Sequence, residues 1–132
     1  MSKQASMKVW SEIVLLTVLG FAVAKSASAA TLISLPLWAT PPADNLACVV
    51  LNVGKKPITT VTVVLAGGAA GSTTCTNLDV GGAPCTILAT APTSGAPAYC
   101  TATFSGSKSN VRGSLLLFDG NTARVMVAVP LN

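Results

Sequence analysis

From residue 31 onward, apolar and polar side chains alternate in short stretches. Residues 58–66 show this most clearly, because Val61, Val63 and Leu65 fall on one side and Thr60 and Thr62 fall on the other. A period of two is that of a β-strand, in which successive side chains point to opposite faces. This stretch therefore predicts a strand with one buried face and one face in water.

Glycine, proline, asparagine and aspartate separate eight such stretches. The predicted strands cover residues 31–40, 47–53, 58–66, 72–78, 85–91, 98–104, 111–118 and 123–131. We expect two hairpins, one around residues 79–84 and one around residues 119–122. Since no stretch after residue 30 has a convincing helical period, the sequence predicts an all-β fold, an antiparallel two-sheet β-sandwich of seven to eight strands.

Some strands carry finer predictions. Pro36 favours an edge position for residues 31–40, because proline lacks the N–H that a central ladder needs. Residues 47–53 are apolar on both sides and predict a central strand that is covered on both faces. The side chains expected to face the core in the last three strands are Cys100, Ala102, Phe104, Leu115, Leu117, Val125, Val127 and Val129.

The first thirty residues have a different character. Two lysines precede an uncharged run at residues 13–24, which is shorter than the roughly 20 residues that a membrane-spanning helix needs. Small residues follow, and Ala27-Ser28-Ala29 gives the A-x-A pattern of a signal peptidase site. We expect residues 1–30 to be a signal peptide, cut before Ala30 or Thr31, and residues 31–132 to form one domain. The alternative is an N-terminal anchor that is not cleaved; the start codon is Met1 or Met7.

Much of the positive charge belongs to the predicted signal peptide. The whole chain has 8 basic and 4 acidic residues and a net charge of +4, whereas residues 31–132 hold five basic residues and three acids, a net charge of +2. Only Lys55 and Lys56 are adjacent, as in many solvated turns. Because nucleic-acid binding calls for clustered Lys and Arg, we expect no nucleic-acid partner.

All four cysteines lie after residue 30, which indicates two disulfides in an exported protein. Cys75 and Cys85 are symmetric about the 79–84 loop, so we expect them to face each other in a hairpin, which leaves Cys48 to pair with Cys100. Four cysteines allow three pairings, and this one is the best supported of them. The spacings of 27, 10 and 15 residues argue against zinc, whose thiolate ligands usually come in close C-x2–4-C pairs.

Around Cys48, Tyr99-Cys100 and the last hairpin, the chain resembles immunoglobulin-like domains. It departs from them because the tyrosine is adjacent to the second cysteine and Trp38 precedes the first. The order Cys48, LNVGKKPITTVTV, Cys75, Cys85, YC and VRGSLLLFD is similar to that of small exported four-cysteine proteins of bacteria. That resemblance spans most of residues 31–132. It implies an immunoglobulin-like sandwich in a periplasmic or secreted protein, and it brings no established activity.

The residue types of common active sites are missing. The chain has no histidine, which excludes Ser-His-Asp and Cys-His arrangements and histidine-based metal centres. The acids after residue 30 lie in separate loops, so a carboxylate pair for glycoside hydrolysis is not expected. Ser105-Gly-Ser-Lys108 matches S-x-x-K, but it lies in a short polar turn and not at a helix start. We expect no enzyme activity, no metal and no cofactor.

Two features remain as candidate contact surfaces. Thr60-x-Thr62 and Thr101-x-Thr103 put hydroxyl pairs on outward faces, where larger arrays bind ordered water or carbohydrate; threonine is also an ordinary residue of half-exposed strands. Trp38 is expected to pack in the core or at its rim, as large aromatics usually do. Its place beside two prolines on an edge strand also makes it, with Leu35 and Leu37, the candidate contact surface.

Together these observations predict an exported, non-enzymatic binding or interaction module of the bacterial cell envelope. We expect its partner to be a protein or a glycan, and the module to be a monomer or a weak oligomer. The alternative is a structural subunit of a surface or pilus-like assembly that donates residues 31–38 as a strand. The chain already has enough strands for a complete sandwich, and Pro36 would interrupt a donated ladder, so the binding module is favoured.

Overall fold

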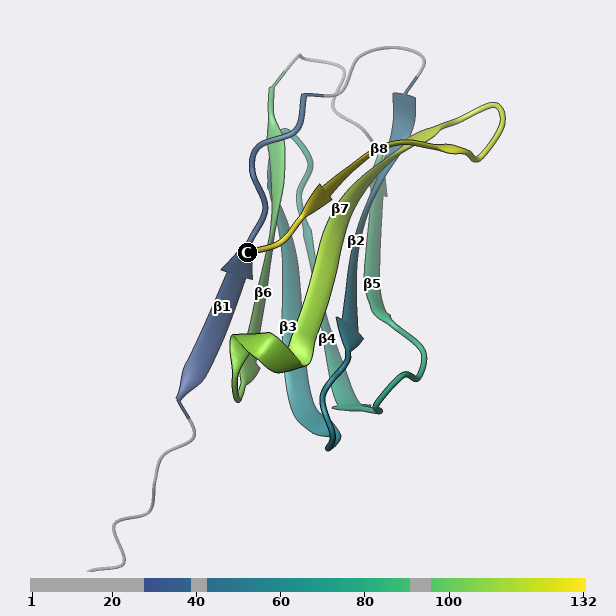
Figure 1. The fold of residues 1–132 in the computed structure, drawn as a ribbon. Helices are drawn as coiled ribbons and strands as arrows, with labels where there is room; N and C mark the ends of the chain where they lie inside the picture. The colour runs from purple at the N-terminus through teal and green to yellow at the C-terminus, as the bar shows by residue number, and fades with distance from the viewer. Residues whose placement is uncertain (1–27, 39–42, 91–95) are drawn as a thin grey trace, which may run out of the picture.

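The computed structural model describes residues 28–38, 43–90 and 96–132, which form two antiparallel β-sheets packed face to face (Figure 1). The strands are β1 (Ala29–Ile33), β2 (Ala43–Asn52), β3 (Ile58–Gly67), β4 (Gly71–Leu78), β5 (Cys85–Thr90), β6 (Ala98–Ser105), β7 (Val111–Asp119) and β8 (Val125–Pro130). A single 3-10 turn, η1 (Lys108–Asn110), precedes β7. One sheet has the order β1-β6-β3-β4 and the other β5-β2-β7-β8, which confirms the predicted two-sheet fold.

The N-terminal strand starts earlier than predicted. β1 begins at Ala29, inside the expected cleavage site, and its regular pairing with β6 ends at Ile33. Pro36 then lies between isolated bridges at Ser34 and Leu37, and β1 is an edge strand, as the proline predicts. Residues 1–27, which hold most of the predicted signal peptide, lie outside the described residues. In the described part of the chain, no helix is long and apolar enough to cross a membrane.

One predicted hairpin is confirmed and the other is wrong. β7 pairs with β8, whereas β4 and β5 are edge strands of opposite sheets. After β4 the chain does not turn back, because Val80 forms a parallel bridge to Asn52 and the Gly81 N–H donates to the Asn52 carbonyl at 2.9 Å. The chain therefore runs past the end of β2 into the second sheet.

Strict alternation builds the core from the inner strands. The predicted inward residues of β3 and β6 are buried, as are Leu115 and Leu117 of β7. The prediction that Val125 faces the core is wrong, because Val125 lies opposite the outward Phe118 and is 51% exposed. Val127 lies opposite the inward Leu117, as predicted, but it is 40% exposed in this edge strand. A register shift at Leu117/Phe118 interrupts the alternation, and the β7–β8 hairpin extends beyond the sandwich (Figure 1).

β2 is central in its sheet, as predicted, but only one of its faces is covered. Leu46, Cys48 and Val50 point into the core, while Leu51 is 38% exposed and Val49 is half-buried. The run is apolar on both sides and therefore predicts a strand that is covered on both faces, which is wrong for the outer face. In this antiparallel sheet the outer face of the run is instead in contact with water.

Three covalent or hydrogen-bonded links hold the two sheets together. Cys48–Cys100 joins the inner strands β2 and β6, and Cys75–Cys85 joins the edge strands β4 and β5, so the predicted pairing is confirmed. At the opposite edge, Ile33 exchanges two backbone hydrogen bonds with Asn132, at 3.0 and 3.1 Å. A disulfide therefore closes one side of the sandwich and main-chain bonds close the other.

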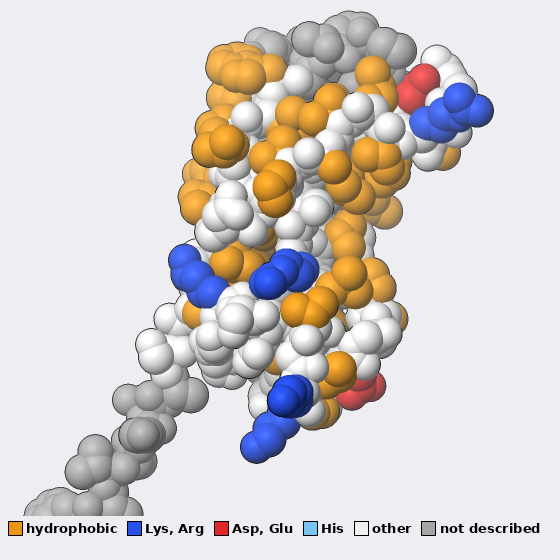
Figure 2. Space-filling view, viewed as in Figure 1, with side chains coloured by type: hydrophobic (Ala, Val, Ile, Leu, Met, Phe, Trp, Pro, Cys, Tyr) orange, Lys and Arg blue, Asp and Glu red, His pale blue; other side chains and the backbone are white. Residues whose placement is uncertain are grey.

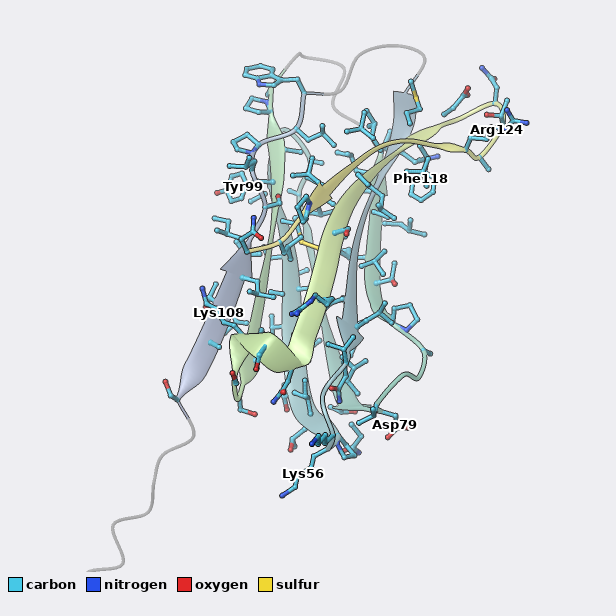
Figure 3. All side chains as sticks on the ribbon, viewed as in Figure 1. Lys56, Asp79, Tyr99, Lys108, Phe118 and Arg124 are labelled. Atoms are coloured by element: carbon cyan, nitrogen blue, oxygen red, sulfur yellow. A yellow bond between two sulfur atoms is a disulfide. The ribbon has the colours of Figure 1, made fainter. Side chains whose placement is uncertain are left out.

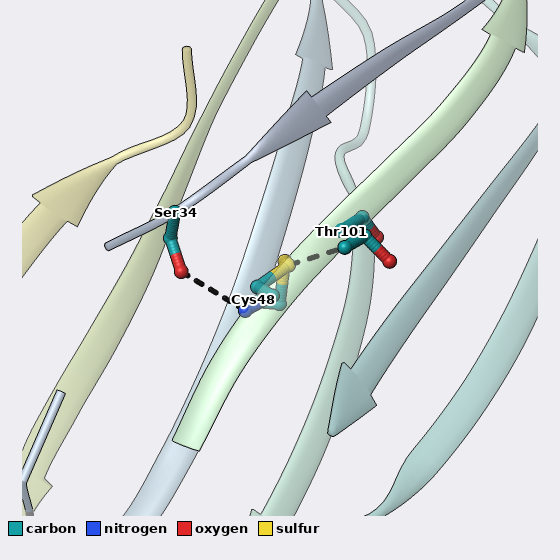
Figure 4. The surroundings of a disulfide bond; sticks show 4 residues. Ser34, Cys48 and Thr101 are labelled. Carbon is teal, nitrogen blue, oxygen red and sulfur yellow. Dashed lines mark hydrogen bonds between the residues drawn. A yellow bond between two sulfur atoms is a disulfide. The ribbon is translucent and has the colours of Figure 1, made fainter. Parts of the chain in front are cut away.

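Two buried polar side chains support these links. Beside the Cys48–Cys100 bridge, the Ser34 hydroxyl accepts a hydrogen bond from the Cys100 N–H at 2.9 Å (Figure 4). At the end of β2, the fully buried Asn52 amide donates to the carbonyls of Lys56 and Leu78, each at 2.8 Å, and its oxygen accepts from the Gly54 N–H at 2.9 Å. Asn52 thus ties the β2–β3 turn to the end of β4.

Candidate binding surfaces

The sequence motif considered for catalysis, Ser105-Gly-Ser-Lys108, lies at the surface of the protein. Ser105 ends β6 and Lys108 begins η1, and both side chains are exposed. Within residues 28–38, 43–90 and 96–132, no three His, Cys, Asp or Glu side chains lie close enough to hold a metal ion. All four cysteines are bridged, so none is a free thiol. The surfaces left to consider are the outer faces of the two sheets and the N-terminal edge.

The outer face of the β1-β6-β3-β4 sheet carries a row of threonines, one from each strand. Thr103 of β6 lies opposite Thr31 of β1 on one side and opposite Thr62 of β3 on the other, and Thr62 lies opposite Thr74 of β4. The hydroxyl oxygens of Thr31 and Thr103 are 3.3 Å apart, as are those of Thr62 and Thr74. One member of each predicted threonine pair, Thr62 or Thr103, therefore belongs to a row that spans the sheet.

Further hydroxyls flank this row on the same face. Thr60 lies opposite Thr76 on one side of it, while Thr101 and Ser72 each lie opposite Val64 on the other. None of the outward side chains of these four strands is charged. The result is an uncharged face of methyl and hydroxyl groups.

Charged groups lie instead at the ends and on the rim. Figure 3 shows Lys56 and Asp79 at one end of the molecule and Arg124 at the tip of the β7–β8 hairpin. In the same hairpin, the Asn121 N–H donates to the Asp119 carboxylate at 2.8 Å and lowers the pKa of Asp119. In Figure 2, Lys and Arg side chains are similarly separated across the visible surface.

The N-terminal edge exposes apolar side chains next to the outer face of the β1-β6-β3-β4 sheet. Leu35 is 69% exposed and Trp38 is 60% exposed. Of the two places expected for Trp38, the core and its rim, the core is therefore wrong. Leu37 is the member of the segment that packs against the core. It exchanges backbone hydrogen bonds with Ala98 at 2.8 and 2.9 Å. Leu37 therefore points inward, and the next residue, Trp38, points outward.

Trp38 and Tyr99 share the outward side of this edge. Because Leu37 and Ala98 are opposite each other and face inward, alternation makes Trp38 and Tyr99 outward diagonal neighbours, a relation within reach of aromatic side chains. Tyr99 is half-buried and points away from the core (Figure 3). We call Leu35, Trp38 and Tyr99 the aromatic corner.

The outer face of the second sheet has an apolar area that extends from β5 to β8. Leu88 of β5 is 70% exposed and Met126 of β8 is 43% exposed. Between them lie the half-buried Leu116 and Phe118 of β7. A shallow hollow on this face is lined by Asn45, Leu88, Phe118, Asp119, Gly120 and Ala123. Phe118 points to the side of the molecule opposite Tyr99 (Figure 3).

Sequence reasoning located Leu35 and Trp38 of the aromatic corner and two of the threonine pairs, and it missed Tyr99, the complete row and the apolar area of the second sheet. A third pair, Thr74-x-Thr76, was visible in the sequence. It aligns with Thr60-x-Thr62 on the preceding strand, whereas the alignment of these strands with β6 and β1 depends on pairing between segments that are distant in the chain. In comparisons with protein-family models, curated proteins and solved structures, nothing matches this chain.

Proposed function

We propose that this protein is an exported, non-enzymatic binding module of the bacterial cell envelope, and that the aromatic corner is its contact surface. The observation that carries the proposal is the exposure of Trp38 beside Tyr99. Exposing a large aromatic to water is unfavourable, and Trp and Tyr are enriched where proteins meet partners. Trp38 and Leu35 therefore form an uncovered apolar site that a protein or glycan partner would cover.

The covalent structure supports an oxidising compartment. Two disulfides in a domain of this size are typical of periplasmic or secreted proteins. The separated basic residues provide no patch for nucleic acid. We therefore place the module outside the cytoplasm, as a monomer or a weak oligomer.

A structural subunit of a surface or pilus-like assembly is the second candidate. Its support comes from the apolar outer face of the β5-β2-β7-β8 sheet, where a second subunit would cover Leu88 and Met126. Strand donation is not favoured as the mechanism. β1 already pairs with β6, and Ile33 already bonds to Asn132, so this segment is occupied within its own chain.

Site-specific photo-crosslinking in an exporting bacterium separates the two candidates. A photoreactive residue replaces Leu35 in one variant and Leu88 in the other, two positions of nearly equal exposure (69% and 70%) on different surfaces. We expect adducts from position 35 that decrease when Trp38→Ala is added, and none from position 88. Chain-to-chain adducts at position 88 alone would contradict the binding module and support the assembly subunit.

Export is tested on the same cells. Intact mass of the periplasmic or secreted protein is expected to correspond to a chain that starts at Ala30 or Thr31. Recovery of the full-length chain only in the membrane fraction would show that residues 1–30 act as an anchor.

A further inference from the structure

We propose that the ligand of this module is a neutral polysaccharide, bound across the threonine face of the β1-β6-β3-β4 sheet and stacked on the aromatic corner. This inference rests on the proposed function, since it names the ligand class for the same surface. It adds an extended site on the sheet to the contact at the corner.

The first step is the continuity of the surface. Along β6, the outward residues Tyr99, Thr101, Thr103 and Ser105 follow one another from the aromatic corner through the threonine row. At roughly 3.3 Å per residue, this line is about 20 Å long, enough for several consecutive sugar rings. Strands about 4.8 Å apart place further hydroxyls on both sides of it. A chain-like ligand would therefore meet polar groups at short, regular intervals.

The second step is the chemistry of the face. Each threonine or serine hydroxyl offers one donor and two acceptor positions, which suits a partner that is itself dense in hydroxyls. The 3.3 Å separation of the hydroxyl oxygens in Thr31–Thr103 and Thr62–Thr74 is long for an O–H···O hydrogen bond. These hydroxyls therefore remain able to form hydrogen bonds with a bound ligand. Because the outward side chains of these four described strands carry no charge, nothing there would attract or neutralise an acidic or basic polymer.

The third step is the aromatic corner. Sugar rings have an apolar side of C–H groups, which stacks on aromatic rings, while indole and phenol groups keep a polar atom for hydrogen bonding. Trp38 and Tyr99 provide two such rings as diagonal neighbours at one end of the hydroxyl line. A folded protein partner would instead favour the opposite face, where Leu88, Leu116 and Phe118 are apolar.

The test uses the oxidised protein recovered after expression of the full chain in an exporting bacterium. Binding is measured by depletion on amorphous cellulose and chitin and by affinity electrophoresis in soluble β-1,3-glucan and amylose. Alginate provides the charged comparison. We expect retention on at least one neutral polysaccharide and none on alginate.

Matched variants locate the site. Thr62→Lys puts a charge in the middle of the row, and its control, Thr86→Lys, puts the same charge on an exposed threonine of the opposite sheet. Thr103→Val removes only a hydroxyl and keeps the β-branched shape, with Thr86→Val as its control. We expect at least tenfold weaker binding for Thr62→Lys and for Trp38→Ala, a smaller loss for Thr103→Val, and no change for either control. Circular dichroism verifies that each variant is folded.

Each other outcome decides against the inference. Absence of binding to every neutral probe by the folded protein would overturn it, and so would binding that Thr62→Lys leaves unchanged. Enrichment in growing ice without polysaccharide binding would replace it with an ordered-water surface. If polysaccharide binding is absent while position 35 still gives Trp38-dependent adducts, the proposed function stands and only the ligand class is wrong.

Discussion

Asn52 is the residue whose replacement tests the fold most directly. Its amide is fully buried and makes three hydrogen bonds that connect the β2–β3 turn to the end of β4. In Asn52→Ala the Leu78 carbonyl, which lies in a buried environment, loses its side-chain donor, at a cost of about 1–3 kcal/mol. The bonds to Lys56 and Gly54 are partly buried, and their loss costs about 1 kcal/mol each.

The expected total is a loss of about 3–5 kcal/mol from the free energy of unfolding, a large share of the roughly 5–15 kcal/mol typical of a domain. Urea denaturation followed by far-UV circular dichroism measures it. Asn45→Ala is the matched control, because Asn45 is an exposed residue of the same strand. We expect that control to change stability by less than about 0.5 kcal/mol.

Asn52→Asp adds a test in which the direction of the pH dependence of stability is predicted. An ionised carboxylate there would face the Lys56 and Leu78 carbonyls in a buried site, so the folded-state pKa of this Asp is raised. The folded state then binds the proton more tightly than the unfolded state. Stability is therefore highest below the unfolded pKa of about 3.9 and falls as the pH rises toward the folded pKa. A loss below about 1 kcal/mol in Asn52→Ala, or an Asn52→Asp variant that becomes more stable as the pH rises, would refute this reasoning.

Three further predictions concern the bridges and the last hairpin. Cys100→Ala should lower the urea midpoint more than Cys85→Ala, because the chain-entropy argument gives about 4 kcal/mol for the 52-residue loop and about 3 kcal/mol for the 10-residue loop; equal midpoints would contradict it. The pKa of Asp119 is lowered in the folded state, chiefly by the Asn121 N–H. The ionised carboxylate therefore stabilises the turn at any pH above the unfolded pKa of Asp119. This contribution is lost as the pH falls through the folded pKa. The protection factors of the hairpin amides, which are corrected for the intrinsic pH dependence of exchange, should therefore fall in acid in the wild type and fall less in Asp119→Asn. Ala123 has a φ of 53°, so Ala123→Gly should raise the free energy of unfolding by about 1 kcal/mol in a thermal or urea melt.

The elements that sequence reasoning predicted well depend on local patterns. Alternation within β3 and β6 identified their buried faces, because burial there requires only one sheet packed on another. The same reasoning failed at Val125, since a register shift is not visible in the residue types. It also failed at Trp38, where a general preference of large aromatics for the core did not apply.

Long-range pairing accounts for the other differences. The disulfide pairing was correct although the hairpin that motivated it does not exist, because edge strands of facing sheets also bring Cys75 and Cys85 together. Thr62 and Thr74 lie on consecutive strands, but Thr31 and Thr103 are far from them in sequence, and only the strand order places the four in one row. The candidate site was therefore predictable in its parts and not in its assembly.

The bonds between Ile33 and Asn132 have a consequence for the timing of folding. They join segments at opposite ends of the described chain, so this closure has one of the largest sequence separations in the domain. Contacts of that kind form slowly, and they cannot form at all until residue 132 has left the ribosome. β1 therefore has no partner at this edge until the segment that follows β8 has been synthesised. A late closure of this type is compatible with translocation as an unfolded chain, followed by oxidation and folding on the far side.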